Sequence, residues 1–168
     1  MFRLKPLSKE GIEAALRKAE RYRLLNEPWE AESICRDVRE VDAKHQEALV
    51  TLLLALTDQF ALEWGRRDLE AARALLPRLQ REYEREYYAG IIAERWAKRL
   101  LAQEAPGTGA AVYRWLEEAM RCYERAERLR PTGEDDAILR WNTCARLIMR
   151  HEHVRPAPAD EGTEPPLE

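Results

Sequence analysis

The chain has 168 residues, and its 28 Lys and Arg nearly balance its 31 Asp and Glu, which gives a net charge of −3. This balance argues against a dedicated nucleic-acid binder, because such proteins carry a basic excess or a basic stripe. No apolar run is long enough to span a bilayer, and no apolar stretch follows the first six residues as it would in a secretory signal. We therefore expect one soluble cytoplasmic domain whose partners include neither nucleic acid nor a membrane.

Apolar residues recur at helical spacing in seven segments, and helix-favouring residues dominate the chain. The first two predicted helices, after Ser8 and from Pro28, have a very short connection and should pack antiparallel as a hairpin. The third predicted helix begins near His45 and is apolar on most of its circumference, which is typical of a central helix. Part of its second apolar side, at Val50 and Leu54, could instead line a groove.

The fourth predicted helix has less certain ends. Asp68 is its expected cap, and Pro77 must kink or end it, because proline removes a backbone hydrogen bond and clashes with the preceding turn. The next two predicted helices cover residues 82–103 and 110–129, on either side of a break rich in Gly and Pro.

The seventh predicted helix follows Pro131, where Thr132 and Asp135 resemble a capping arrangement. We assign residues 1–8 to an N-terminal arm and residues 9–152 to a single helical domain. The tail 153–168 is rich in Pro and acidic residues and has no apolar period, so we expect it to be disordered.

A repeated spacing runs through three of the second helices, where a small residue is followed by larger or apolar ones and then by the exit from the helix. The three sets are Ala31, Cys35, Val38 and Ala43; Ala72, Leu76 and Leu79; and Ala119, Tyr123, Ala126 and Pro131. This spacing resembles the tetratricopeptide repeat family, most closely over residues 15–43 and 123–131. The resemblance implies an all-α protein with antiparallel hairpins stacked as a short α-solenoid.

The steps from Ala31 to Ala72 and from Ala72 to Ala119 are longer than the family's unit of about 34 residues. The array would therefore be degenerate, and a divergent helical bundle is the alternative architecture.

The same resemblance implies that the first helices line a concave face and bind a peptide or protein segment there. The residues it nominates are Glu13, Arg17 and Glu20 in the first helix; Val50, Leu54, Thr57 and Asp58 in the third; Tyr87, Glu94, Arg95 and Arg99 in the fifth; and Arg140, Asn142 and Arg146 in the seventh. The Lys and Asn pattern with which some members grip a C-terminal carboxylate is missing. We predict a non-enzymatic scaffold or adaptor. A self-associating structural protein is the alternative, and a helical enzyme or small-ligand carrier is less favoured.

Motifs that carry chemistry are sparse. The three cysteines are far apart, and we expect buried, reduced thiols. The sequence His151-Glu152-His153 resembles a metal-binding triplet, but alternate side chains on a helix point apart, so we expect an exposed helix end. The segment Gly107-Thr108-Gly109 is too short for a phosphate-binding loop. We nominate no catalytic residue and expect no metal or cofactor.

The five tryptophans are spread one to a helix or hairpin, at positions 29, 64, 96, 115 and 141. We expect them to pack between helices. Trp64, which precedes Gly65, is the one for which we expect partial exposure.

Overall fold

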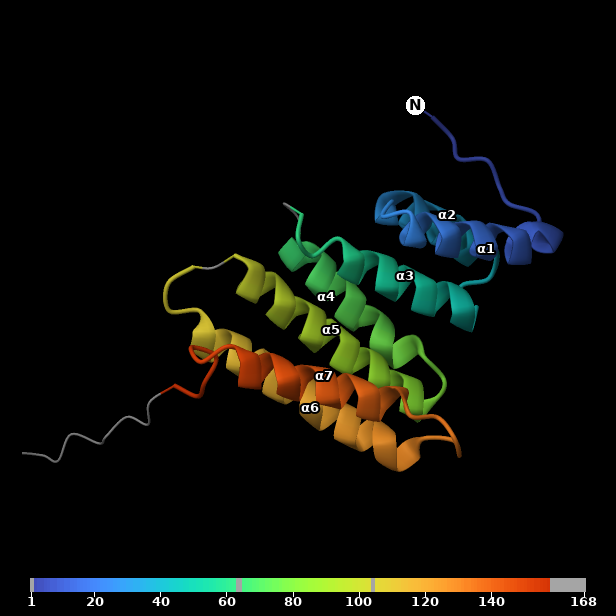
Figure 1. Ribbon diagram of the computed structural model, residues 1–168. Helices are drawn as coiled ribbons and strands as arrows, with labels where there is room; N and C mark the ends of the chain where they lie inside the picture. The colour runs from blue at the N-terminus through green and yellow to red at the C-terminus, as the bar shows by residue number, and fades with distance from the viewer. Residues whose placement is uncertain (1, 63–64, 104, 158–168) are drawn as a thin grey trace, which may run out of the picture.

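The computed structural model describes residues 2–62, 65–103 and 105–157. These residues form seven α-helices and two short 3₁₀ turns, with no β-strand among them, which confirms the all-α prediction (Figure 1). The helices are α1 (Ile12–Leu24), α2 (Pro28–Val41), α3 (Gln46–Asp58), α4 (Gly65–Leu75), α5 (Glu82–Ala102), α6 (Gly109–Leu129) and α7 (Asp136–Arg150).

The connection between α1 and α2 is a tight turn. Asn26 has a φ of 60°, the left-handed conformation that commonly ends a helix. The N–H of Glu27 donates to the carbonyl of Tyr22 at 2.8 Å, which closes the last turn of α1. Pro28 then opens α2, where its missing N–H would have had no helical partner. The predicted turn therefore forms where the sequence places it.

The third helix is central, as predicted from its apolar circumference. Eight of its thirteen residues are buried. His45 precedes it as a cap, because its Nδ1 accepts from the N–H of Ala48 at 3.4 Å. Beyond its last turn, the buried Gln59 donates to Glu32 of α2 at 2.7 Å and to the carbonyl of Ala55 at 3.3 Å. These polar contacts fix α3 against the first hairpin.

The fourth helix differs from its prediction at its start and agrees at its end. It begins at Gly65, so Asp68 lies in its first turn and the predicted cap is wrong. A side chain at Gly65 would place a Cβ 2.3 Å from the carbonyl oxygen of Phe60, which accounts for glycine there. The helix ends at Leu75, and Pro77 lies in a following 3₁₀ turn, so of the two expected outcomes, a kink or an early stop, the structure shows the stop.

The sixth and seventh helices are joined through residues 130–135. The predicted capping by Thr132 is wrong, because α7 begins at Asp136 and Asp135 precedes it without a side-chain capping bond. Glu134 instead accepts from the N–H of Asp136 at 3.1 Å. An acidic group at this position also suits the positive end of the helix dipole.

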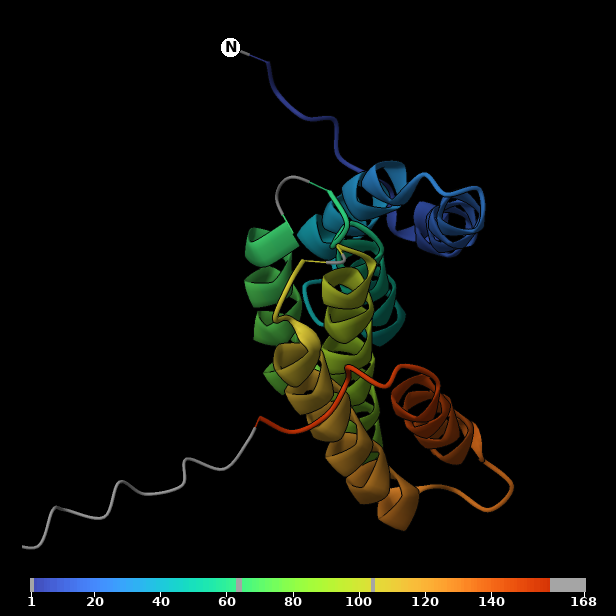
Figure 2. The same ribbon diagram turned by 60° about the vertical axis from the view of Figure 1, so that its left-hand side comes forward.

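Two hydrophobic cores meet at α5. The first lies within α1 to α4 and includes Ile92 and Trp96 of α5, whereas the second lies within α5 to α7 and includes Ile91 and Val154. Opposite faces of one helix therefore serve both cores. In Figure 2, α1 and α7 lie on the same side of α3 and α5, with α4 on the other side. Residues 158–168, which make up most of the predicted tail, lie outside the described residues.

The tryptophans differ in their surroundings. Trp96 is buried in the first core, and Trp115 and Trp141 are half-buried against the two cores. Trp29 is exposed at the start of α2, which contradicts the prediction of packing for that residue. Trp64 lies outside the described residues.

Candidate functional site

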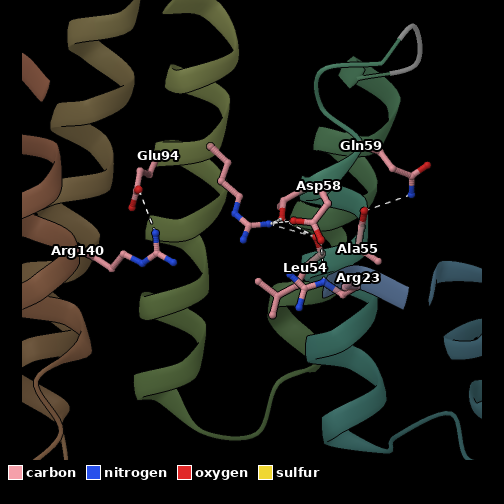
Figure 3. A network of polar contacts seen from close by, with 9 residues as sticks. Arg23, Leu54, Ala55, Asp58, Gln59, Glu94 and Arg140 are labelled. Atoms are coloured by element: carbon pink, nitrogen blue, oxygen red, sulfur yellow. Dashed lines mark hydrogen bonds and ion pairs between the residues drawn. The ribbon is translucent and has the colours of Figure 1, made fainter. Parts of the chain in front are cut away.

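A fully buried carboxylate lies where α5, α6 and α7 meet. The residue is Glu94 of α5, which is 0% exposed. Its Oε1 accepts from Nη1 of Arg140 at 3.2 Å (Figure 3). Its Oε1 also accepts from Nζ of Lys98, and its Oε2 accepts from the hydroxyl of Tyr123 at 2.7 Å. A buried charge is costly unless it is paired and hydrogen-bonded, and these three donors meet that need. We call these four residues the Glu94 cluster.

A second ion-pair cluster joins α1, α3 and α5. Asp58, the last residue of α3, accepts from Nε of Arg23 at 2.7 Å and from Nη1 of Arg95 (Figure 3). The same Nη1 donates to Oγ1 of Thr57 at 2.6 Å and to the carbonyl of Leu54 at 3.3 Å. Arg95 therefore satisfies carbonyl and side-chain oxygens of the last turn of α3, where a positive charge also suits the helix dipole. We call this group the Asp58 cluster.

The two clusters place cations on one face. We call the side of α3 and α5 that lies between α1 and α7 the inner face (Figure 2). Its cations are Arg23, Arg95, Lys98 and Arg140, and the side chains of Lys98 and Arg140 are 41% and 35% exposed. Four cations share two carboxylates there, so the clusters carry two surplus positive charges in a chain whose net charge is −3.

The arginines of the inner face are only partly buried. Among the described residues, the only buried side-chain polar atoms without a hydrogen-bond partner are the Nε atoms of Arg39 and Arg99. The side chains of Arg23, Arg95 and Arg140 are 17%, 24% and 35% exposed, so each remains partly in contact with solvent beside its carboxylate. A guanidinium has five donors in a rigid fork, so one edge can bind the protein's carboxylate while another faces outward.

Three tyrosines lie within the first half of α5, near these cations. The rings of Tyr83 and Tyr87 stack with centroids 5.8 Å apart, and Tyr87 and Tyr88 meet edge to face at 5.2 Å. All three are half-buried. Burial raises the pKa of the Tyr88 hydroxyl to about 12, and burial also raises the pKa of Tyr87, an effect that Arg140 opposes. These phenols therefore stay protonated at neutral pH and offer apolar faces.

The structure brings together six of the residues nominated from the sequence. Leu54, Thr57, Asp58 and Arg95 meet in the Asp58 cluster, and Glu94 and Arg140 meet in the Glu94 cluster. Tyr87 lies in the tyrosine series. Val50 is half-buried against the first core.

The other nominated residues lie apart from the two clusters. Arg17 and Glu20 are exposed on α1, and Arg17 pairs with Glu13 of its own helix at 3.8 Å. Arg99 stacks on the ring of Trp96 at 4.6 Å and lies beside Gly65, at the start of α4. On α7, Arg146 is exposed and Asn142 is half-buried.

Sequence reasoning missed Arg23, Lys98 and Tyr123. Lys98 was detectable, because it follows Glu94 by four residues, a spacing that favours an ion pair on a helix. Tyr123 had no comparable signal, since its apolar helical spacing indicates core packing and gives no hint of the carboxylate that its hydroxyl meets. From the sequence, Arg23 cannot be distinguished from a charged residue on a solvent-exposed helix face.

The cysteines are inert structural residues. Cys35, Cys122 and Cys144 are all free and buried, as predicted. Burial raises the pKa of the thiols of Cys35 and Cys144 to about 12, so neither forms the reactive thiolate at neutral pH. Across residues 2–62, 65–103 and 105–157, no group of three or more His, Cys, Asp or Glu is placed to hold a metal ion. Nor does any described helix have the length and apolarity needed to cross a membrane.

Comparisons of the chain with protein-family models, with curated proteins and with solved structures found no match.

Proposed function

We propose that this protein is a non-enzymatic binding module, a degenerate tetratricopeptide-like array that holds an acidic segment of another protein on its inner face. The observation that carries the proposal is the position of Arg23, Arg95 and Arg140. These residues come from α1, α5 and α7, and each is held by a carboxylate while its side chain stays partly exposed. Charge complementarity then favours a partner rich in Asp and Glu.

The fixed position of these arginines supports binding over a merely solvated charged face. Asp58 and Glu94 hold the guanidinium groups before any ligand arrives, so less side-chain entropy is lost on binding. A hydrogen bond to a charged group contributes about 1.5–3 kcal/mol, about twice that of a neutral pair. Several such bonds together give a basis for recognising an acidic segment.

The tyrosines of α5 supply the apolar part of the proposed surface. Tyrosine and arginine are enriched at the energetically dominant positions of protein interfaces, because each combines apolar area with polar groups. Burial raises the pKa of the Tyr87 hydroxyl, and a hydrogen bond with Arg140 opposes that rise, which places Tyr87 beside Arg140. A segment with both acidic and apolar residues therefore fits this face better than a purely acidic one.

The order of the helices supports the tetratricopeptide-like part of the proposal. The repeated spacing falls on α2, on α6 and on a middle segment that starts at Ala72 of α4 and continues past its end to Leu79, and the inner-face clusters are built mainly from α1, α3, α5 and α7. The alternation of first and second helices thus agrees with the arrangement that the resemblance implies.

Self-association is a second candidate, favoured by exposed apolar residues at the two ends of the helical array. Leu24, Leu25 and Trp29 are exposed at the turn between α1 and α2, and Leu139 and Met149 are exposed on α7. Light scattering at micromolar concentration separates the two candidates. A dimer that L139E and M149E convert to a monomer would support self-association, whereas a monomer at all concentrations would exclude it.

Selection from a random peptide library displayed on phage tests the binding proposal. The full chain is the bait, and R95Q and R140Q are used in parallel with R128Q, an exposed arginine of α6, as the matched control. We expect the wild-type chain and R128Q to enrich sequences rich in Asp, Glu and aromatic residues, and R95Q and R140Q to lose them. Enrichment without acidic residues, or equal enrichment by all four baits, would contradict the proposal.

A further inference from the structure

A cavity of about 770 Å³ lies at the C-terminal ends of α5 and α7 and adjoins the Glu94 cluster at Lys98, which lines it. Its walls are the end of α5, the connection from α5 to α6, and the segment that leaves α7. Sites that bind small molecules have volumes of about 300–1,000 Å³, so this cavity is large enough for a metabolite-sized ligand.

The two histidines after α7 converge here, contrary to the expectation from sequence. That expectation assumed that His151 and His153 continue the helix, but α7 ends at Arg150, and His151 has φ −113° and ψ 95°. The N–H of Val154 donates to the carbonyl of His151 at 2.8 Å, and the side chain of Val154 is buried, so the segment is fixed as a turn. The two imidazole rings then lie 5.7 Å apart, edge to face.

The segment Gly107-Thr108-Gly109, which is too short for a phosphate-binding loop, also lines this cavity. A Cβ at Gly109 would lie 2.0 Å from the carbonyl oxygen of His153, so only glycine lets the segment after α7 pack on the start of α6. Gly107 has a φ of 79°, which glycine adopts without strain. The histidine pair and the glycine-rich segment, each a weak signal in the sequence, therefore line the same cavity.

The lining combines nitrogen-bearing and apolar side chains. Lys98, His151, His153 and Arg155 line the cavity, and the lining that the structure describes includes no carboxylate. Lys98 is shared with the buried Glu94, so Arg155 and the two imidazoles are the donors free of an internal carboxylate partner within the described residues. The apolar wall is formed by Leu101, Ala102, Pro106, Ala110 and Pro156.

We propose that this cavity binds a small phosphate monoester, with its phosphate toward Arg155 and the histidines and its organic part against the apolar wall. A phosphate group presents several acceptor oxygens in different directions, which suits donors that approach from separate segments. Arginine forms two parallel hydrogen bonds to phosphate, and the imidazole N–H groups add further donors. Among the described lining residues the site shares Lys98 with the inner face, but its phosphate contacts are assigned to Arg155 and the histidines, so the proposal does not depend on the proposed partner.

Titration of the full chain, followed by heteronuclear NMR, tests the assignment. The probes are glycerol phosphate and inorganic phosphate, with sodium chloride at matched ionic strength as the reference. We expect glycerol phosphate to cause saturable shifts in the amides of residues 107–110 and in the imidazole C–H signals of His151 and His153, with weaker binding of inorganic phosphate. R155Q and H153Q should each weaken binding by about tenfold, the loss of one charge-assisted contact. H45Q, which changes the one histidine outside the cavity, should bind as the wild type does.

Three results would overturn the proposal. No saturable shift beyond the chloride reference would exclude an anion site. Binding of inorganic phosphate without binding of glycerol phosphate would exclude the monoester. Wild-type affinity in both R155Q and H153Q, with each variant folded by circular dichroism, would exclude this cavity.

Discussion

Glu94 and Arg95 are adjacent on α5 but bind different parts of the molecule. The carboxylate of Glu94 is reached from α6 and α7, whereas the guanidinium of Arg95 reaches the end of α3. Consecutive residues on a helix are about 100° apart around its axis, so one turn of α5 can serve two clusters. This arrangement links the two hydrophobic cores through a single helix and sets the cations of the inner face.

Glu94→Gln should destabilise the fold through the loss of its charge. The variant leaves Arg140 and Lys98 without their buried carboxylate, and breaking a buried pair costs about 3–5 kcal/mol. Because both cations are partly exposed, we expect a smaller loss of about 2 kcal/mol in the free energy of unfolding. Urea denaturation measures this loss in the free energy of unfolding. Glu118→Gln, which breaks the exposed pair with Arg73, should cost less than about 1 kcal/mol. Equal losses in the two variants would show that burial of Glu94 adds nothing.

Gly90→Ala should also destabilise, although alanine is favoured over glycine inside a helix by about 1 kcal/mol. A Cβ at this position would lie 2.4 Å from Cε1 of the Tyr123 ring, which is fully buried and tied to Glu94. We expect the clash to exceed the gain in helix propensity and to lower the unfolding free energy by about 1–3 kcal/mol. The matched change Ala14→Gly, at an exposed position of α1, gives the propensity contribution alone. A more stable Gly90→Ala variant would show that α5 and α6 separate easily.

Stability should fall as the pH rises above about 9, the range in which unfolded thiols ionise. In the folded chain, burial raises the pKa of the thiols of Cys35 and Cys144 to about 12. Between these values the unfolded state releases protons that the folded state keeps, so the free energy of unfolding decreases with pH. Each thiol contributes a slope of about 1.4 kcal/mol per pH unit there. Urea denaturation at several pH values should show a flatter dependence in C35A/C144A. An unchanged slope in that variant would mean that other groups control the effect.

The contact between Arg73 and Trp115 should couple α4 to α6. The guanidinium lies 4.7 Å from the centre of the indole ring and also pairs with Glu118 at 3.1 Å. We expect R73Q to cost about 0.5–1 kcal/mol, because a cation–π contact at a partly exposed site contributes about that much. A double-mutant cycle with Trp115→Leu isolates the pair. Strict additivity of the two single changes would remove the proposed coupling.

The sequence predicts the helices well because their signals are local. The apolar periods, the tight turn before Pro28 and the early stop at Pro77 each depend on residues within one or two turns, and the structure agrees with them. The caps at Asp68 and Thr132 are predicted wrongly. Other residues of the chain decide those helix starts: Gly65 packs closely on the carbonyl of Phe60, and Glu134 accepts from the start of α7.

The candidate sites are less predictable because their members are far apart in sequence. The inner face needs Arg23 next to Asp58, and the Glu94 cluster needs Tyr123 of a second helix, which the family pattern does not assign to the concave face. The histidine pair converges only because α7 ends at Arg150, a boundary that no proline or glycine marks. The distances between the members of these sites depend on how helices far apart in the sequence pack together. The spacing of residues along one helix does not predict them.

The most direct test of the binding proposal follows the arginine side chains themselves. NMR signals of the guanidinium Nε–H groups are recorded while an acidic peptide from the library selection is added to the full chain. We predict saturable shifts for Arg23, Arg95 and Arg140, no shift for Arg128, and loss of binding when the peptide's acidic residues are changed to their amides. Shifts confined to arginines outside the inner face, or binding that survives the amide changes, would contradict the account.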